Sequence, residues 1–305
     1  MLSFRQLRAL AALAETEHFR KAAERVHISQ PALSSQIQSL EEQLGITLVE
    51  RTRRRVLFTP AGRAMAERAR SILSAVQDME AAARSLASPL EGLLRIGVPP
   101  TLGPYLLPHV LPGLKARYQG LRLYLREENI KSQLAELNRG EIDLLLGLGP
   151  LEGEGRLAEP LFDEPLWLAL PLGHPLAAKL QVDVSDLAGL DLVLFERDGD
   201  GLRELGLSLC RQGGAAEHPD FKATSLDTLR QMVVSGLGAS ILPALYVTAE
   251  ALDDSQIIMR PFADPVPARR IDLAWRRTDP RADAFRQLAM QLRDTLPPSV
   301  RIKLP

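Results

Sequence analysis

Four short polar side chains share one face of a predicted helix and are the first candidates for chemistry in this 305-residue chain. Gln30, Ser34, Ser35 and Gln38 carry no charge, whereas a merely solvated helix face is more often rich in Lys and Glu. Amide and hydroxyl groups of this kind hydrogen-bond to base edges in the major groove of DNA. The pattern therefore predicts a surface that reads a nucleic-acid sequence.

Cys210 is the second candidate, and it is the only cysteine of the chain, so no intrachain disulfide can form. A free cysteine is commonly a small buried hydrophobe with an inert thiol. Alternatively, its thiolate is oxidised to a sulfenic acid, which is then reversed or capped by a low-molecular-weight thiol. Arg203 and Arg211 are near in sequence and would lower the pKa of the thiol if they lie near in space. A disulfide between two copies of Cys210 is a third interpretation.

Signatures of enzymes and metal sites are missing from the sequence. The five histidines show no i,i+4 pairing, and neither a G-x-S-x-G nor a G-x-x-x-x-G-K-[ST] motif occurs. We therefore expect no catalytic residues, no metal site and no cofactor. No signal-peptide pattern and no apolar run of roughly 18 residues is present, so we expect no membrane partner. Together with the single cysteine, this favours a cytoplasmic location.

The helix that positions the polar face is delimited by its own residues. Ser29 is a good N-cap, Pro31 suits the first turn, and Gly45 suits a left-handed C-cap. The opposite face carries an apolar stripe that must pack inward, made of Leu33, Ile37, Leu40 and Leu44. With a shorter amphipathic helix before it, the stretch 18–45 predicts a helix-turn-helix, and an ordinary helical hairpin is the alternative.

A basic turn between two β-prone runs, 46–49 and 56–59, follows this helix. Its cations are Arg51, Arg53, Arg54 and Arg55. This is the layout of a wing, a hairpin whose arginines lie over the phosphate backbone. A solvated basic turn is the alternative, but the position directly behind the predicted recognition helix favours the wing.

Charge is unevenly distributed along the chain. Residues 1–70 hold twelve Lys or Arg and seven Asp or Glu, a net charge of +5, while the whole chain has a net charge of −1. The remaining residues therefore have a net charge of −6. A basic N-terminal module on an acidic body predicts a local anionic partner, with double-stranded DNA as the first candidate.

A long helix is expected after the wing, because no Gly or Pro occurs between Gly62 and Pro89. Its apolar positions step by four and three without exception and are Met65, Ala69, Ile72, Val76, Met79, Ala83 and Leu86. Such a heptad seam packs against a partner helix, most simply that of a second copy. A dimer would present two recognition helices to two half-sites of DNA. Packing against the body of the same chain is the alternative.

The remaining residues alternate between strand and helix patterns in two α/β lobes. Apolar continuity in the strands suggests a mostly parallel sheet that is covered on both faces. Residues 221–224 are expected to form one of the strands. A cleft between the lobes, near helix N-termini, is the natural place for a ligand. Thr101 follows the first strand and is expected to be a donor in that cleft.

The N-terminal run AAERVHISQPALSSQIQSLEEQLGITLVERTRRRVLFTPAG closely resembles LysR-type transcriptional regulators, and the resemblance extends over the whole chain. It implies a winged helix-turn-helix (1–60), a linker helix that dimerises (61–88) and a periplasmic-binding-protein-like α/β effector domain (91–305). Subdomain I of that domain would comprise about 91–163 and 268–305, and subdomain II about 164–267. Such regulators form homodimers, usually assemble further into homotetramers, and bind promoters. An activator among them also contacts RNA polymerase.

Within this family the regulatory part is similar to the OxyR branch of peroxide sensors, through PTLGPYLLPHVLP (100–112), PLFDEPLWLA (160–169) and SLDTLRQMVVSGLGASILPAL (225–245). The OxyR pattern has a histidine and a reactive cysteine before a Leu-Arg pair, whereas Asp200 and Gly201 precede Leu202 here. Cys210 matches the second cysteine and Thr101 a pocket threonine. Ile130 replaces a second pocket threonine, and Arg276 is matched to an arginine near the site.

Two hypotheses for the signal follow. In the first, the regulator controls oxidative-stress genes through oxidation of Cys210 by peroxide. In the second, a small molecule fills the interlobe cleft near Thr101 and Ile130, and Cys210 is structural.

Overall fold

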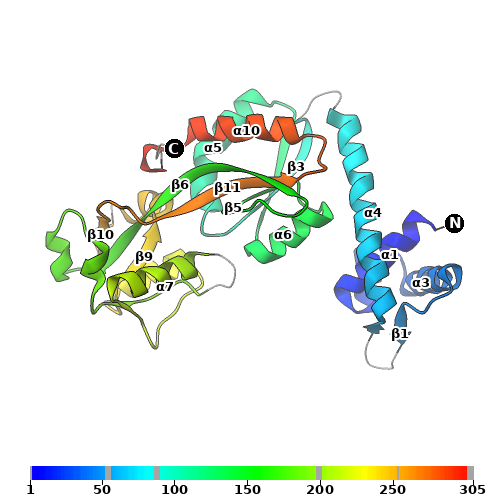
Figure 1. Ribbon diagram of the computed structural model, residues 1–305, viewed down its shortest axis with the longest axis horizontal. Helices are drawn as coiled ribbons and strands as arrows, with labels where there is room; N and C mark the ends of the chain where they lie inside the picture. Colours follow the sequence, from blue (N-terminus) through cyan, green and yellow to red (C-terminus); the bar gives the residue numbers. More distant parts are fainter. Residues whose placement is uncertain (1, 52–55, 86–89, 197–200, 253, 301–305) are drawn as a thin grey trace. The chain divides into compact units, whose positions relative to one another are not determined.

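The computed structural model describes residues 2–51, 56–85, 90–196, 201–252 and 254–300. These residues form two compact units, 1–83 and 84–305, which we describe separately (Figure 1). Among the described residues, no helix has the length and apolar character needed to span a membrane. The expected fold class, a winged helix-turn-helix followed by a mixed α/β domain, is confirmed.

The N-terminal unit consists of four helices and one small hairpin. Its elements are α1 (Phe4–Thr16), α2 (Phe19–Arg25), α3 (Gln30–Leu44), β1 (Val49–Arg51), β2 (Val56–Phe58) and α4 (Pro60–Ser85). Helix α3 begins where expected, since the Ser29 hydroxyl accepts a hydrogen bond from the Ala32 amide at 3.3 Å. It ends at Gly45, whose φ of +66° is the left-handed conformation that glycine adopts freely.

The core of this unit fixes α3 against α1 and the hairpin. Leu33 and Ile37 are fully buried, together with Leu10 and Leu13 of α1. Glu41 then joins α3 to the hairpin, because its Oε1 accepts hydrogen bonds from the amides of Leu48 (2.7 Å) and Val49 (3.0 Å). Helix α3 and the base of the hairpin are therefore joined directly.

The seam of α4 is divided between two environments. Met65 and Ala69 pack on the core of the N-terminal unit. Further along, Ile72 is 46% exposed and Met79 is 66% exposed. The side chain of Ala83 and all of Leu86 lie outside the described residues. The first part of the predicted seam is thus covered by its own chain, and the exposed part remains available to a partner helix.

The C-terminal unit is built on one seven-stranded sheet with strand order β10-β6-β11-β5-β3-β4, with β9 also paired to β6. Its strands are β3 (Gly92–Val98), β4 (Leu121–Glu127), β5 (Leu144–Leu148), β6 (Arg156–Pro171), β9 (Ser240–Pro243), β10 (Ile257–Pro261) and β11 (Ala268–Arg276), with β7 (Asp191–Leu192) and β8 (Ala216–Glu217) as a separate parallel pair. The α-helices are α5 (Gly103–Arg117), α6 (Ile130–Arg139), α7 (Leu202–Gly213), α8 (Leu226–Val234), α9 (Ala244–Tyr246) and α10 (Ala282–Thr295), and short helical turns are η1 (Pro175–Ala178), η2 (Val184–Leu187), η3 (Val247–Ala251) and η4 (Pro298–Val300).

Two expectations about this unit are wrong. The sheet is mixed rather than mostly parallel, because only β3 pairs in parallel, with β4 and β5, whereas β6 and β11 make antiparallel pairs. The apolar character of the strands is still explained, because α5 and α10 cover one face of the sheet and α6 covers the other. Residues 221–224 form no strand, and only Ala223 makes an isolated bridge, to Phe195.

Strand β11 runs beside the first half of β6, and β6 continues from this lobe into the other (Figure 1). The first half of β6 packs with β5 and β11 in the core of one lobe, around Trp275. Its second half, including Leu168 and Leu170, packs in a separate core with β9, β10 and α7. The chain thus forms two lobes that share one long strand, which places a cleft between them.

Candidate functional site

The outer face of α3 presents the predicted polar side chains to solvent. Gln30, Ser35 and Gln38 are exposed and Ser34 is partly exposed, while Ser29 and Pro31 at the start of the helix are exposed as well. Gln38 Nε2 donates a hydrogen bond to Glu42 Oε1 at 3.1 Å, one turn along the same helix. The structure therefore brings the four predicted polar side chains together on an accessible helix face, with Ser29 and Pro31, also candidates for DNA contact, at its accessible start.

The hairpin expected to be a wing is present beside α3. Strands β1 and β2 are antiparallel, with Val49 opposite Phe58 and Arg51 opposite Val56. Arg51 ends β1, and its side chain is not described. Arg53, Arg54 and Arg55 lie outside the described residues.

A pocket of about 520 Å³ lies between the two lobes of the C-terminal unit. Its lining residues are Ile130, Leu148, Gly149, Gly201, Glu204, Leu205, Ala268, Arg269 and Arg270. Two of the six predicted pocket residues, Ile130 and Gly201, are among them. Leu202 is instead buried in the core of its lobe, and Asp200 lies outside the described residues.

Arg269 lines the pocket and connects it to Thr101, and the sequence interpretation did not single this residue out. Its side chain is fully buried and its Nε donates to Glu164 Oε2 at 2.7 Å. Its Nη1 donates to Thr101 Oγ1 at 3.0 Å and its Nη2 to the Thr101 carbonyl at 2.8 Å. Thr101 is therefore held beneath the pocket by the arginine rather than lining it directly.

Arg276, which the sequence comparison matched to the pocket arginine, lies elsewhere in the structure. Its Nη1 donates to the carbonyls of Leu137 (3.1 Å) and Ile142 (3.0 Å), and its Nη2 donates to Asp279 at 3.1 Å. These partners stabilise the end of α6 and the chain before α10. The arginine beside Thr101 is Arg269, seven residues earlier on the same strand.

Gly201 has a backbone conformation that disfavours a side chain. It precedes α7 with a φ of +76°, where a residue other than glycine is strained by about 1–2 kcal/mol. A Cβ atom built at this position would also lie 2.5 Å from Leu148 Cδ2, so the leucine would have to move. The position that holds the reactive cysteine in the OxyR pattern is thus shaped here for glycine.

Cys210 lies near the end of α7 and is 5% exposed. Burial raises the pKa of its thiol, the nearby Glu217 carboxylate raises the pKa further, and Arg211 lowers the pKa only partly. Arg203 does not serve as a counter-ion, because its guanidinium pairs with Glu217 at 2.7 Å and with Glu196. The reduced thiol is therefore shielded, and of the two arginines that would lower its pKa if they lay near in space, only Arg211 does so.

The described residues contain no group of three or more His, Cys, Asp or Glu side chains arranged to hold a metal ion. None of the described residues that line the interlobe pocket is a Ser, Thr, Cys, Lys or His, and both of its arginines are engaged in ion pairs. Arg270 pairs with Asp272 at 2.6 Å, and Arg269 with Glu164. The two candidate sites are therefore an interlobe pocket and an accessible polar face of α3.

Comparisons with known proteins agree with this geometry. Residues 4–63 match the family described as "Bacterial regulatory helix-turn-helix protein, lysR family", and residues 87–297 match the "LysR substrate binding domain". The chain belongs to the LysR family of DNA-binding transcriptional regulators. Its helix-turn-helix and its two-lobed domain are the two parts that define such a regulator.

Within the family the chain is similar to OxyR proteins. It is 42% identical over 292 residues to the "DNA-binding transcriptional dual regulator OxyR" of Escherichia coli strain K12, covering 96% of this chain and 95% of that protein. It is 43% identical over 293 residues to the "Hydrogen peroxide-inducible genes activator" of Pectobacterium carotovorum subsp. carotovorum, covering 96% of both chains. A solved full-length OxyR cysteine-to-aspartate variant from Pseudomonas aeruginosa has a TM-score of 0.75 and 34% identity, covering 99% of this chain and 100% of that chain.

Proposed function

We propose that this LysR-family protein reads promoter DNA through the outer face of α3 and regulates peroxide-inducible genes. The observation that carries the DNA-reading part is the exposed polar face of a capped helix whose opposite side buries Leu33, Ile37 and Leu40. The basic charge of residues 1–70 supports contact with phosphates. The class of genes is supported by the names of the relatives that the chain matches along 96% of its length.

The thiol of Cys210 is the proposed entry point of the peroxide signal. The thiolate attacks one oxygen of hydrogen peroxide and gives a sulfenic acid and hydroxide. A low-molecular-weight thiol then displaces water and leaves a mixed disulfide, so no second cysteine is needed. Because Cys210 is buried among Leu202, Leu209 and their neighbours, this oxidation requires the surroundings of α7 to open first. Once oxidised, the sulfur no longer fits its apolar site, and α7 is displaced next to the interlobe pocket.

Mass spectrometry after peroxide treatment tests this proposal, combined with a reporter gene in cells. The expected result is oxidised Cys210 in the wild type and loss of peroxide induction in Cys210→Ser. A matched control is Ser208→Ala on the same helix, which should induce normally. The redox proposal fails if Cys210 stays reduced while Cys210→Ser retains normal induction.

A second candidate signal is a small molecule bound in the interlobe pocket. It is favoured by the volume of about 520 Å³, by apolar walls from Ile130, Leu148 and Leu205, and by the absence of a side chain at Gly201. In that case Leu205→Trp, which fills the pocket, should abolish the response to the signal, whereas Cys210→Ser should leave it intact. A normal response of Leu205→Trp together with a lost response of Cys210→Ser supports oxidation of the Cys210 thiol as the signal.

The assembly follows from α4. We propose a homodimer that buries Ile72 and Met79 of two linker helices, assembles further into a homotetramer and contacts RNA polymerase where it activates. The functional division is the one expected from the sequence, 1–60, 61–88 and 91–305, with subdomains at about 91–163 with 268–305 and at 164–267. The protein acts in the cytoplasm, where promoter DNA lies, and binds without catalysing a reaction or holding a cofactor.

A further inference from the structure

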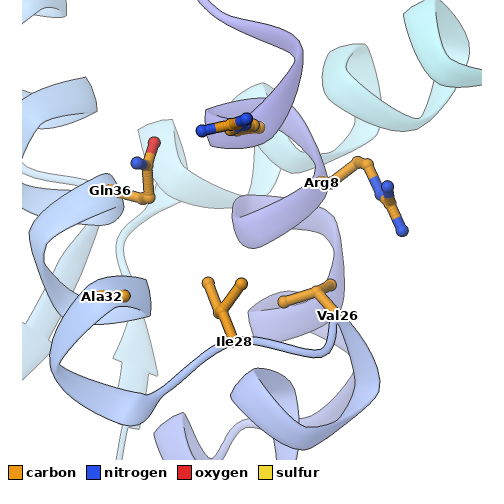
Figure 2. A pocket seen from close by; sticks show the side chains of 6 residues that line it. Arg8, Val26, Ile28, Ala32 and Gln36 are labelled. Carbon is orange, nitrogen blue, oxygen red and sulfur yellow. The ribbon is translucent and has the colours of Figure 1, made fainter.

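A pocket on the N-terminal unit borders the polar face of α3. It has a volume of about 350 Å³ and is lined by Arg5 and Arg8 of α1, Val26 and Ile28 of the turn between α2 and α3, and Ala32 and Gln36 of α3. The floor is apolar, and Ile28 remains 40% exposed. Figure 2 shows Ile28 pointing into the space between α1 and α3. The pocket is therefore open to a partner that approaches α3.

Two arginines, one turn apart on α1, give this pocket a positive charge. Arg5 and Arg8 are both exposed, and neither side chain has a hydrogen bond or ion pair with a described residue. By contrast, Arg25 of the same unit pairs with Glu15 at 2.8 Å. Figure 2 shows the side chain of Arg8 extending outward from α1. No acidic side chain is among the described residues that line the pocket, so the charge of its arginines is not compensated there.

The hairpin and the pocket lie beside different edges of the polar face of α3. Consecutive residues of an α-helix are rotated by about 100° around its axis. With Gln30 at 0°, Ser35 lies at about 140°, and Glu41, which holds the hairpin, lies at about 20°. Ala32 and Gln36, which line the pocket, lie at about 200° and 240°. The polar face therefore has the hairpin beside one edge and the pocket just beyond the other.

This arrangement matches the two phosphate backbones that border a major groove. The groove of B-DNA is about 12 Å wide, and an α-helix with its side chains is about 10–12 Å across, so a helix in the groove has a backbone on each side. The predicted wing belongs to the side of the hairpin. On the other side, the pocket offers guanidinium groups that can bind phosphate oxygens and an apolar floor that can cover a deoxyribose ring.

We propose that the pocket binds one sugar–phosphate unit of the DNA strand that borders α3 on the side away from the hairpin. Arg5 and Arg8 bind the phosphate oxygens, and Ile28 contacts the deoxyribose. The proposal rests on the proposed reading of DNA by α3. The role of both arginines is positioning, because phosphate contacts carry no sequence information but fix the register and orientation of the protein on the duplex.

Equilibrium binding of the full-length protein to an operator fragment, selected with the wild type, tests the proposal. Affinity is measured by fluorescence anisotropy over a series of salt concentrations, and sequence preference by binding-site selection. The test variants are Arg5→Ala, Arg8→Ala and their combination. The matched control is Arg68→Ala, which removes an exposed arginine of α4 outside the pocket. The variant Arg5→Lys with Arg8→Lys keeps both charges, and circular dichroism checks that each variant is folded.

Each single test variant should reduce the salt slope of the binding constant by about 1 for every bound protomer. The combination should weaken operator binding by about tenfold or more and leave the sequence preference unchanged. The lysine variant should keep most of the salt slope and bind less tightly than the wild type, because an ammonium group cannot make paired hydrogen bonds to a phosphate. Arg68→Ala should behave as the wild type.

Phosphate ethylation locates the contact. Ethylation of one phosphate at the edge of each half-site should inhibit binding of the wild type and have no effect on the combined variant, since the variant no longer uses that phosphate. Inhibition of both proteins by ethylation at the same set of phosphates would contradict the proposal.

Three further results would overturn the proposal: unchanged affinity and salt slope of the combined variant, an equal loss in Arg68→Ala, and an altered sequence preference of the combined variant. The last result would show that the arginines contact bases. None of them would refute reading by α3, provided that Gln30→Ala still changes the sequence preference. Failure of the wild type to bind any operator would refute the proposed DNA-reading function itself.

Discussion

Replacing Glu164 with Gln should destabilise the C-terminal unit strongly, because it breaks a fully buried ion pair at the shared strands. Glu164 and Arg269 are both 0% exposed in their side chains. The two carboxylate oxygens of Glu164 are used separately, one by Arg269 Nε at 2.7 Å and one by the Leu245 amide at 2.9 Å. An amide has only one oxygen, so one of these two donors necessarily loses its acceptor.

The magnitude follows from what remains after Glu164→Gln. The Arg269 guanidinium stays buried and keeps only its bonds to Thr101, so a buried charge is left without a counter-charge. Removal of one partner of a buried pair costs about 3–5 kcal/mol. We expect a loss near 3 kcal/mol, since the glutamine retains the shape of the site. With a urea slope of about 3 kcal/mol/M, this loss lowers the unfolding midpoint by about 1 M.

Urea titration followed by tryptophan fluorescence measures this loss selectively. Both tryptophans of the chain, Trp167 and Trp275, lie in the C-terminal unit, on β6 and β11. Asp283→Asn is the matched control, because it breaks an ion pair with Arg286 in which Asp283 is 92% exposed. This control should cost less than about 0.5 kcal/mol.

A loss below about 1 kcal/mol for Glu164→Gln, or one equal to the control, would refute the reasoning. A double replacement, Glu164→Leu with Arg269→Met, should recover much of the lost stability, since removing both charges removes the desolvation penalty.

Three further predictions concern the thiol, the wing and the linker. Because burial raises the pKa of Cys210, the rate of its alkylation by iodoacetamide should be low at neutral pH. This rate should increase only at pH values above those at which an exposed cysteine becomes reactive. A rate profile that matches that of a free thiol would contradict the prediction. The raised pKa also means that this group's stabilising contribution is complete below the pKa of the unfolded thiol and is lost as pH rises through the folded pKa. Gly62→Ala should destabilise the N-terminal unit by about 1–3 kcal/mol, because the new Cβ would lie 2.0 Å from the Leu48 carbonyl oxygen at the base of the wing. Thermal unfolding followed by circular dichroism measures this loss. A gain in stability, which is the ordinary result of Gly→Ala in a helix, would contradict close packing of α4 on the hairpin. Replacing the arginines at positions 53–55 with alanine should weaken binding to all DNA sequences and reduce the salt dependence of the binding constant, as measured by fluorescence anisotropy. Gln30→Ala should instead change the sequence preference, as measured by binding-site selection. Equal behaviour of both variants would contradict the division between positioning and reading residues.

Local signals made α3 predictable in detail. The N-cap Ser29, the buried stripe with Leu33 and Ile37, and the C-cap Gly45 act within a few residues, so the sequence contains most of the information. The polar face of α3 was predictable because burial of one side of a helix determines which side is exposed.

Long-range pairing accounts for what the sequence did not predict. Apolar strands arise equally from parallel sheets and from antiparallel strands covered by helices on both faces, so the mixed sheet around β6 could not be read from composition. Arg269 and Arg276 lie seven residues apart on β11, so they face opposite sides of the sheet, and only the packing of the lobes determines which side meets Thr101. The sequence alone therefore could not decide which arginine reaches Thr101.

The burial of Cys210 was equally hidden. On a helical projection it borders the apolar side of α7, and only the packing of the lobe places it inside the core. The pairing of Arg203 with Glu217 also depends on residues fourteen positions apart. Both facts make the thiol less reactive at rest than its sequence neighbours suggest.

A genome-wide footprint with and without peroxide, in strains carrying the wild type or Cys210→Ser, tests the central claim most directly. The account predicts that the wild type occupies a defined set of promoters, that peroxide changes its footprint there, and that Cys210→Ser occupies the same promoters without the change. A footprint that peroxide leaves unaltered in the wild type, or alters equally in both strains, would contradict it.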